Sequence, residues 1–447
     1  MDNYVRKVKI KSLFERDNNL EIFFTETTNC IYGDNGTGKT TVINLIVSAL
    51  KCDIKKLVDI PFHSLEIMTA KRGTRRACKA IKIEKISDSN LEYYVYSSNI
   101  TVSIDIQNED KDNNKKIDDL VCSLNKLLHL TYVPLSRLGY NDPTSYESDS
   151  YLLNRSLRAR NFSQAEILDI MDASRRMLGL IEKEFVDRYA SIQKKISIDS
   201  AKMKNNVVQK VLIDKSFIRK VDTIHMKIHS ARNLVIRTNN PQEILNKFKE
   251  ANIEVLPSSL DEHFKLYDDI TKEFETAKTK YNQEDSSSTQ NYSKAYYRKF
   301  ATVVMLECLS SIISDIETIE KNKNEYLQMY NVTESVINEF FLPRKKFYFN
   351  SKGGFAVDCN GNDINISNLS SGEKHLIALL GRVALQYSGA SVFLADEPEL
   401  SLHLDWQRSL ISSMKKLSPN MQIIVATHSP AIIPSDSNQI DLEDCKI

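Results

Sequence analysis

The sequence GDNGTGKTT, residues 33–41, matches the pattern GxxxxGK followed by Ser or Thr at every fixed position. Glycines at these places let backbone N–H groups turn inward around a phosphate group. The strand-like segment NCIY precedes the stretch, and apolar residues at helical spacing from Val42 to Leu50 follow it. A chance glycine-rich turn is the alternative, but a strand before and a helix after favour a phosphate-binding loop.

Two residues of this loop have distinct expected tasks. Lys39 can reach the β- and γ-phosphates of a nucleotide, and the hydroxyl of Thr40 can ligate Mg²⁺. The helix that starts near Lys39 also points the positive end of its dipole at the phosphates. We therefore expect ATP and Mg²⁺ as cofactors, with the nucleotide contacted by Asn35, Gly36, Thr37, Gly38, Lys39, Thr40 and Thr41.

A second motif, SVFLADEPELSLH at residues 391–403, places two carboxylates after a compact apolar run. Such a run suits a buried strand of a parallel sheet, whose carboxyl end would present Asp396 and Glu397. Asp396 can hold Mg²⁺ through water, and Glu397 can orient the attacking water. The alternative is an acidic helix N-terminus without a catalytic role.

A third motif, ATHSP at residues 426–430, follows another apolar run. His428 is positioned there to donate a hydrogen bond to a γ-phosphate. A lone histidine is more often structural, but the two neighbouring motifs favour the catalytic interpretation. Glu397 and His428 are thus the expected catalytic residues, and Thr40 and Asp396 the expected metal ligands.

The turn NLSSGE, residues 368–373, begins a further predicted helix. Backbone N–H groups and a serine hydroxyl at a helix start can bind a γ-phosphate. An ordinary helix cap explains the same residues when they are taken alone. Ser370, Ser371, Gly372 and Glu373 are therefore candidates for nucleotide binding only together with the other motifs.

Composition excludes several classes of protein. The chain has 447 residues, with 60 Lys and Arg against 59 Asp and Glu, so no global charge points to nucleic acid or membrane. The seven cysteines form no CxxC pair, which argues against a zinc site or a disulfide framework. The N-terminus lacks an apolar secretion signal, and no apolar run is long enough to cross a bilayer. We expect a cytoplasmic protein.

Periodicity divides the chain into three segments. Residues 1–162 and 341–447 alternate between strands and helices, with a loop expected at 108–116 and a strand at 129–137. Residues 163–340 have long amphipathic helical periodicity, with capping boxes at 163–166 and 259–262 and a third long helix from about Ser293 towards Tyr330. The fold class expected is α/β with a helical insertion in the form of a short coiled coil or bundle.

Together the motifs resemble those of ABC-type ATPases. The turn from Leu369 to Glu373 looks like their signature motif, and Leu400 to His403 look like the loop after the acidic pair. The resemblance implies a P-loop ATPase head with a mixed β-sheet and flanking helices in two lobes. It also implies that the signature of one copy closes over ATP held by another, in a homodimer or a higher even-numbered assembly.

A helical insertion that splits the head resembles the branch with SMC, Rad50, RecF and OLD proteins. The variants DEPELSLH and ATHSP look most like AAA15/AAA21-type ATPases, among them the PtuA family of Septu and retron anti-phage defence systems. That resemblance implies an HNH nuclease partner of the PtuB kind, and it admits a reverse transcriptase and the RNA–DNA of a retron. We expect no nuclease site in this chain, because only 19 residues follow His428.

Two positions depart from the superfamily pattern. Members usually carry a glutamine after the strand that leads to the insertion, where this sequence has Ser136 and Arg137. The aromatic residue that stacks on adenine is not evident from the sequence, and Phe14 is our suggestion.

Other functions stay open at this point. The basic segments AKRGTRRACK (70–79) and NRSLRAR (154–160) suit a nucleic-acid backbone, although a solvated loop explains the first one better. A DNA repair ATPase of the RecF or Rad50 kind is an alternative, as is a module that binds ATP for assembly with little turnover. A transporter subunit fits poorly because of the helical insertion.

Overall fold

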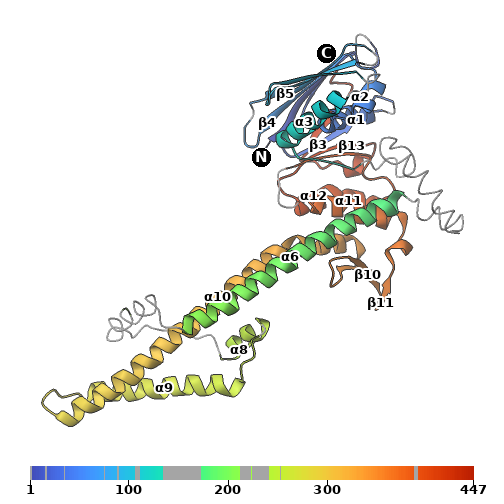
Figure 1. The fold of residues 1–447 in the computed structure, drawn as a ribbon. Helices are drawn as coiled ribbons and strands as arrows, with labels where there is room; N and C mark the ends of the chain where they lie inside the picture. Colours follow the sequence, from blue (N-terminus) through green and yellow to red (C-terminus); the bar gives the residue numbers. More distant parts are fainter. Residues whose placement is uncertain are drawn as a thin grey trace. The chain divides into compact units, whose positions relative to one another are not determined.

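The computed structural model describes residues 3–15, 18–34, 36–74, 76–87, 90–105, 111–133, 173–211, 223, 241–251, 253–386 and 391–447. The chain forms two compact units, one of residues 1–188 with 329–447 and one of residues 189–328 (Figure 1). The three domains predicted from the sequence, residues 1–162, 163–340 and 341–447, remain a proposal.

The first unit contains a six-stranded antiparallel sheet with strand order β2-β1-β4-β5-β6-β7. Its strands alternate between buried and solvent-facing side chains, as a sheet covered on one face should. The strands are β1 (Asn3–Lys11), β2 (Leu20–Phe23), β4 (Ser64–Lys71), β5 (Cys78–Lys85), β6 (Asn90–Val95) and β7 (Ile100–Asp105).

A five-stranded parallel sheet with order β14-β3-β13-β12-β8 carries the predicted motifs. Every residue of β12 and β13 is buried, because these strands are interior and covered on both faces. The predicted buried strands at 391–395 and 422–427 are therefore confirmed. The strands are β3 (Thr28–Tyr32), β8 (Leu130–Val133), β12 (Val392–Asp396), β13 (Gln422–Ala426) and β14 (Asn438–Asp441).

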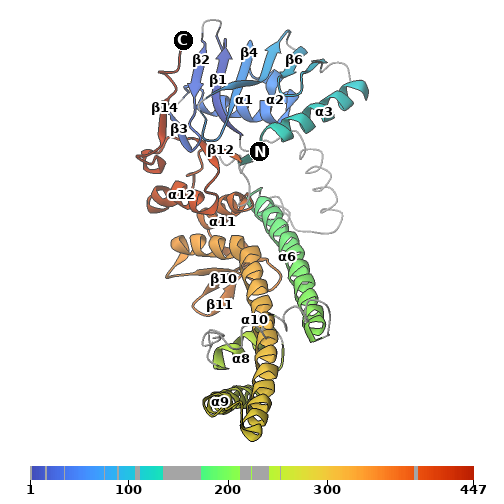
Figure 2. The ribbon, with the colours of Figure 1, turned by 90° about the vertical axis from the view of Figure 1, so that its left-hand side faces the viewer.

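Helix α1 (Lys39–Lys51) lies between the two sheets, and its apolar residues share one core with both of them (Figures 1 and 2). Helices α11 (Ser371–Ala384) and α12 (Leu404–Leu417) cover the opposite face of the parallel sheet (Figure 2). Since α1 begins directly after the glycine-rich loop, this layering fixes the loop at the carboxyl edge of the parallel sheet. Helices α2 (Ile54–Asp59) and α3 (Lys111–Leu127) complete this part.

A small antiparallel sheet of β9 (Lys346–Phe349), β10 (Phe355–Cys359) and β11 (Asn362–Ile364) packs near the base of the two longest helices. The ring of Phe185 lies 5.2 Å from that of Phe355, and the ring of Tyr330 lies 4.9 Å from that of Phe349. These aromatic contacts pack this sheet against the parts of helices α6 (Ala173–Val211) and α10 (Ser286–Phe341) that belong to the first unit.

The second unit is helical. Its part of α6 runs beside α10, where the Tyr326 hydroxyl donates a hydrogen bond of 3.2 Å to Asp199. Helix α9 (Pro257–Thr279) packs antiparallel to α10, with Arg298 and Glu273 forming an ion pair of 2.8 Å. Helix α8 (Pro241–Glu250) joins them through an apolar cluster that includes Phe248 and Ile316. The predicted helical insertion is confirmed as part of the fold class.

Two local predictions are wrong, and one strand was not predicted. Helix α3 begins at Lys111, inside the predicted loop. Leu120, Leu124 and Leu127 are buried in the core and stabilise its second half, and the helix continues from there into its polar first turns because helix formation is cooperative. Helix α9 starts at Pro257 rather than at the predicted capping box, since proline favours the first helical position. Strand β4 was not predicted, although its alternation was visible in the sequence.

Two further predictions are corrected or fall outside the described residues. Helix α10 starts at Ser286, earlier than predicted, with the Asp285 carboxylate accepting hydrogen bonds from the N–H groups of Ser287 and Ser288 at 3.0 and 3.1 Å. The capping box at 163–166 and the basic segment 154–160 lie outside the described residues, as do Ser136 and Arg137.

Candidate nucleotide-binding and hydrolysis site

The glycine-rich loop adopts the backbone conformation that its glycines make accessible. Gly36 and Gly38 have φ angles of 86° and 94°, in the left-handed region that suits glycine. The Thr37 hydroxyl donates a 3.0 Å hydrogen bond to the carbonyl of Asp34, which closes the loop upon itself. Asn35 lies outside the described residues.

Helix α1 offers an N-terminus suited to an anion. Its first turn begins with Lys39, Thr40 and Thr41 and contains no acidic residue, and no side chain among the described residues caps it. Backbone N–H groups without a capping partner, added to the helix dipole, favour a phosphate at this end. The structure therefore fits the expectation for the phosphates, with Gly36 facing open space rather than other atoms.

Lys39 is buried and folds back over the loop. Its ammonium donates hydrogen bonds of 2.8 and 2.9 Å to the carbonyls of Gly33 and Asp34. Burial lowers the pKa of Lys39, while the nearby carboxylates of Glu397, Asp396 and Asp34 act in the opposite direction. These interactions place the two carboxylates of the second motif close to the loop lysine, as the sequence predicted.

Asp396 and Glu397 stand at the carboxyl end of β12. Asp396 is only 2% exposed, and α1 packs against β12. The Thr40 hydroxyl and the Asp396 carboxylate are hard oxygen donors of the kind that Mg²⁺ prefers, so this edge of the sheet fits the ion. Glu397 has a φ angle of 50°, and this left-handed conformation turns the chain sharply after the strand.

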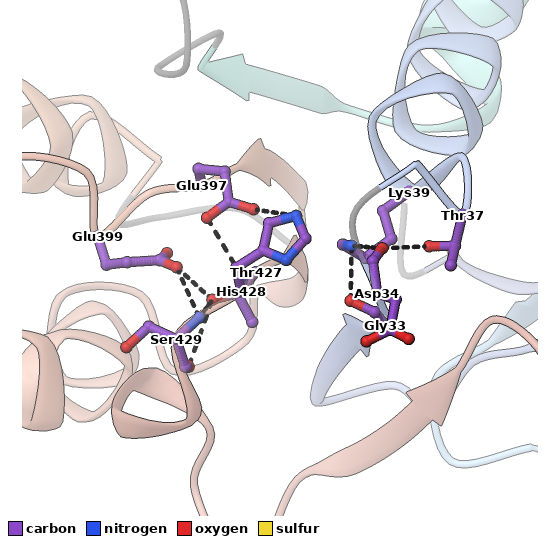
Figure 3. A network of polar contacts seen from close by, with 9 residues as sticks. All are labelled: Gly33, Asp34, Thr37, Lys39, Glu397, Glu399, Thr427, His428 and Ser429. Carbon is purple, nitrogen blue, oxygen red and sulfur yellow. Dashed lines mark hydrogen bonds and ion pairs between the residues drawn. The ribbon is translucent and has the colours of Figure 1, made fainter.

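Glu397 contacts His428 across two neighbouring strands (Figure 3). The backbone N–H of His428 donates to Oε2 of Glu397 at 3.3 Å, and the Nε2 of His428 lies 3.6 Å from Oε1. The sequence predicted both residues at this edge, and the parallel pairing of β12 with β13 brings them together.

Glu399 joins this group, although the sequence analysis did not single it out. Its carboxylate accepts hydrogen bonds from the Thr427 hydroxyl and from the Ser429 N–H, the latter at 3.3 Å (Figure 3). Burial, together with the contact to Glu399, raises the pKa of Glu397 to about 8.

The predicted signature turn caps helix α11. The Ser370 hydroxyl accepts a hydrogen bond from the Glu373 N–H at 3.3 Å, and the Glu373 carboxylate accepts one from the Ser370 N–H at 2.8 Å. Lys345 forms an ion pair of 2.7 Å with Glu373. Ser370 and Ser371 are exposed, and the Ser370 hydroxyl also donates a hydrogen bond to the Glu373 carboxylate at 2.9 Å. The capping geometry agrees both with an ordinary helix cap and with a turn that binds nucleotide.

A comparison with protein families decides the class. A profile of the family described as "AAA ATPase domain" matches residues 4–433, nearly the whole chain. The chain belongs to this AAA ATPase family. The prediction of an ATPase of the AAA15 type is thereby confirmed.

Three curated relatives match parts of this AAA ATPase. A retron Vc95 probable ATPase of Vibrio cholerae is 26% identical over 44% of the chain and 35% of its own length. A retron Ec83 probable ATPase of Escherichia coli is 33% identical over 19% of the chain and 17% of its own. The DNA double-strand break repair Rad50 ATPase of Sulfolobus acidocaldarius is 26% identical over 45% and 23%. The chain thus spans about a third or less of these relatives.

Solved SMC head domains align weakly with the AAA ATPase. The head of Pyrococcus furiosus Smc covers 96% of this chain and 91% of its own, at 14% identity and a TM-score of 0.37. The head from Thermotoga maritima gives 10% identity and a TM-score of 0.34. No helix in the described ranges is long and apolar enough to cross a membrane.

Gly372 lies against the turn that follows the acidic pair. A Cβ atom at this position would stand 2.6 Å from the carbonyl oxygen of Ser401. Ser401 itself has a φ angle of 69°, so its backbone has little freedom to move away. Only glycine fits here, which gives the signature glycine a structural reason within its own chain.

His375, in α11, lies in contact with the same turn. Burial lowers the pKa of His375 to about 4, although a hydrogen bond with the backbone of Pro398 partly opposes this. Because proline has no N–H, the imidazole must donate this bond to the Pro398 carbonyl. The folded protein therefore holds His375 neutral.

Acid should weaken the fold through His375. An unfolded histidine has a pKa of about 6.5, so below that pH the unfolded chain binds a proton that the folded chain does not. Stability from this group is complete above pH 6.5 and is lost as the pH falls towards 4, by about 2 kcal/mol at pH 5. Urea unfolding at pH 7 and pH 5, followed by the fluorescence of Trp406, the single tryptophan, measures this loss of unfolding free energy.

The matched variants for this measurement are His375→Leu and His63→Gln. His375→Leu should lose about 2 kcal/mol less stability between pH 7 and pH 5 than the unchanged protein. His63 is exposed, so its variant should follow the unchanged protein. Equal losses in all three proteins would contradict the assignment.

Two further features from the sequence analysis are Phe14 and the basic segment 70–79. Phe14 is half exposed, and its Cε2 stands 3.3 Å from where a Cβ on Gly38 would lie, beside the loop. In the basic segment 70–79, Lys79 forms an ion pair of 2.7 Å with Glu66. Such pairing favours the interpretation of a solvated sheet surface.

Sequence reasoning missed Glu399, Lys345 and His375. A glutamate two residues after Glu397 was a usable signal, because a sharp turn can return it to the same edge. Lys345 and His375 had no local signal, since their partners Glu373 and Pro398 are recognised only in three dimensions.

Proposed function

We propose that this chain is a Mg²⁺-dependent ATPase whose active sites are completed by a second copy, and that it serves as the ATPase subunit of a retron-type anti-phage defence complex. The contact of Glu397 with His428, beside the lysine of the phosphate-binding loop, is the observation that carries the ATPase activity. The retron ATPases among its relatives support the defence role.

The residues of the loop bind and orient the nucleotide in this proposal. Lys39 exchanges its two carbonyl partners for phosphate oxygens, and the first N–H groups of α1 contact the same phosphates. Phe14, beside Gly38, stacks on the adenine. Thr40 and Asp396 would hold Mg²⁺, which when bound would offset the negative charge that develops on the phosphates.

Glu397 and His428 act on the reacting atoms. The carboxylate of Glu397 orients the attacking water in line with the γ-phosphate, and His428 donates a hydrogen bond to that phosphate. Phosphoryl transfer depends mainly on positioning and charge, so an oriented water matters more than a strong base. The contact between the two residues holds them in one arrangement before the nucleotide binds.

The second copy enters through the signature turn. Ser370 and Ser371 are exposed at the start of α11, where a partner's γ-phosphate can reach their hydroxyl groups and the helix N-terminus. A head-to-tail pair would then contain two composite sites. We place the nuclease activity in a separate HNH protein, with the reverse transcriptase and RNA–DNA of a retron as further partners in the cytoplasm.

Native mass spectrometry of the protein purified from its own operon, with and without ATP, tests this function. We expect an even-numbered assembly that carries a nuclease-sized protein and RNA–DNA. Purification of a Lys39→Met variant from the same operon is the control, because it should keep the fold but lose the ATP-dependent species. A protein that neither hydrolyses ATP nor changes assembly with it would contradict the proposal.

DNA repair is the second candidate, supported by the match to a Rad50 ATPase over 45% of the chain. A bare protein that forms dimers with ATP and then loads on DNA ends would favour it over defence.

A further inference from the structure

Glu397 and Glu399 lie two residues apart in one tight turn. The Leu400 N–H donates to the Glu397 carbonyl at 3.1 Å, and the Leu402 N–H donates to the Glu399 carbonyl at 2.9 Å. Because Glu397 has a left-handed backbone, the turn directs both carboxyl groups towards the end of β13 (Figure 3). Two acidic side chains from one turn thus meet the segment that contains His428.

Glu399 binds the residues on both sides of His428. Oε1 of Glu399 accepts the Thr427 hydroxyl and the Ser429 N–H. The Ser429 hydroxyl donates in turn to Gln407 of α12 at 2.7 Å, which ties the segment to that helix. The backbone between Thr427 and Ser429 therefore has little freedom, and His428 projects from its centre.

A packing role alone does not explain a carboxylate here. Glu399 is only 5% exposed, and burial of an acid costs several kcal/mol unless hydrogen bonds compensate it. Within the described ranges, its Oε2 accepts no hydrogen bond from an N–H or hydroxyl group. An apolar side chain would fill the same space at lower cost, so the acceptor itself has a task.

We propose that Glu399 is a positioning residue for hydrolysis, which fixes the segment 427–429 so that His428 and Glu397 meet at the γ-phosphate. This inference rests on the proposed ATPase function. Glu399 touches neither phosphate nor water in this account, and it acts through the two residues that do. Its loss should therefore change turnover and leave nucleotide binding, which depends on the loop, in place.

The decisive variants are Glu399→Leu and Glu399→Gln. Leucine removes the acceptor, and we expect kcat to fall about 10- to 100-fold with KM for ATP nearly unchanged, as displaced catalytic groups do. Glutamine keeps a carbonyl oxygen for Thr427 and Ser429, so it should retain most of the activity. Glu182→Leu is the matched control, because Glu182 also accepts a backbone N–H, that of Phe355 at 2.9 Å.

A second variant tests the same proposal in case Glu399→Leu does not fold. Thr427→Val removes one donor with little change of shape and should lower kcat in the same direction. If Glu399 and Thr427 act as one unit, the double variant should lower kcat by less than the product of the two single effects. The Ser429 N–H keeps the Thr427 hydroxyl as an acceptor at 3.0 Å in Glu399→Leu, so the fold should survive.

Hydrogen exchange of residues 422–430 gives a readout independent of turnover. Protection of the His428 and Ser429 amides should fall in Glu399→Leu and stay unchanged in Glu182→Leu. The inference is overturned if Glu399→Leu keeps full kcat, if its protection is unchanged, or if glutamine is as damaging as leucine. An unchanged protein that binds ATP without hydrolysing it would overturn the proposed function as well, which separates the two failures.

Discussion

Replacing Glu397 with glutamine should lower kcat for ATP hydrolysis about 100-fold or more, as loss of a group that orients and deprotonates water does. The amide keeps the size of the side chain and can still accept the His428 N–H, which lies 3.3 Å from the carboxylate. It cannot accept a proton from water. ATP affinity should stay close to that of the unchanged protein, because Lys39 and the start of α1 are intact.

Steady-state kinetics, ATP binding by calorimetry and native mass spectrometry measure these effects together. An ATP-bound dimer should accumulate in Glu397→Gln, since hydrolysis no longer releases it. Glu339→Gln is the control, because Glu339 forms an ion pair with Lys416 instead. If Glu397→Gln hydrolyses ATP at the normal rate, another residue orients the water and our assignment is wrong.

The second large effect is expected at Lys39. Replacement by methionine keeps the aliphatic stem but removes the ammonium group, which now bonds the carbonyls of Gly33 and Asp34. Charged hydrogen bonds contribute about 1.5–3 kcal/mol each, so the loss of contacts to two phosphates should weaken ATP binding about 100-fold or more. Hydrolysis should become undetectable at ATP concentrations that saturate the unchanged protein.

The fold should tolerate the Lys39 change. Lys39→Met removes two hydrogen bonds to carbonyls but also the burial of a charge, and these effects oppose each other, so the thermal midpoint should stay nearly unchanged. Lys51→Met, at the other end of α1, is the matched control and should bind ATP normally. Unchanged ATP affinity in Lys39→Met would show that the loop does not hold the nucleotide.

Much of this site was predictable because its motifs are local. The glycine-rich loop needs left-handed residues at Gly36 and Gly38, and the spacing of glycines shows this directly. The apolar runs before Asp396 and His428 predicted buried parallel strands, since only strands covered on both faces are apolar throughout. The Ser370 cap was also readable, because a capping box is a local pattern.

Local patterns misplaced some elements of the fold. Helix α3 begins in a polar stretch that alone favours a loop, and the packing of Leu120 and Leu124 in the core overrides that preference. Helix α9 begins at Pro257 rather than at the capping box, whose first residue comes two positions later. In both cases a contact or a backbone constraint outweighed the side-chain pattern.

The sequence by itself predicted which residues would meet the phosphates, because that chemistry depends on neighbours along the chain. Only the tertiary structure decided that Glu399 binds Thr427 and Ser429, that Gly372 must make room for Ser401, and that His375 lies under Pro398. These contacts join residues that are 23 to 30 positions apart, as 375 from 398 or 399 from 429. They arise from the parallel pairing of β12 with β13 and the packing of α11 beneath the sheet, which no single segment specifies.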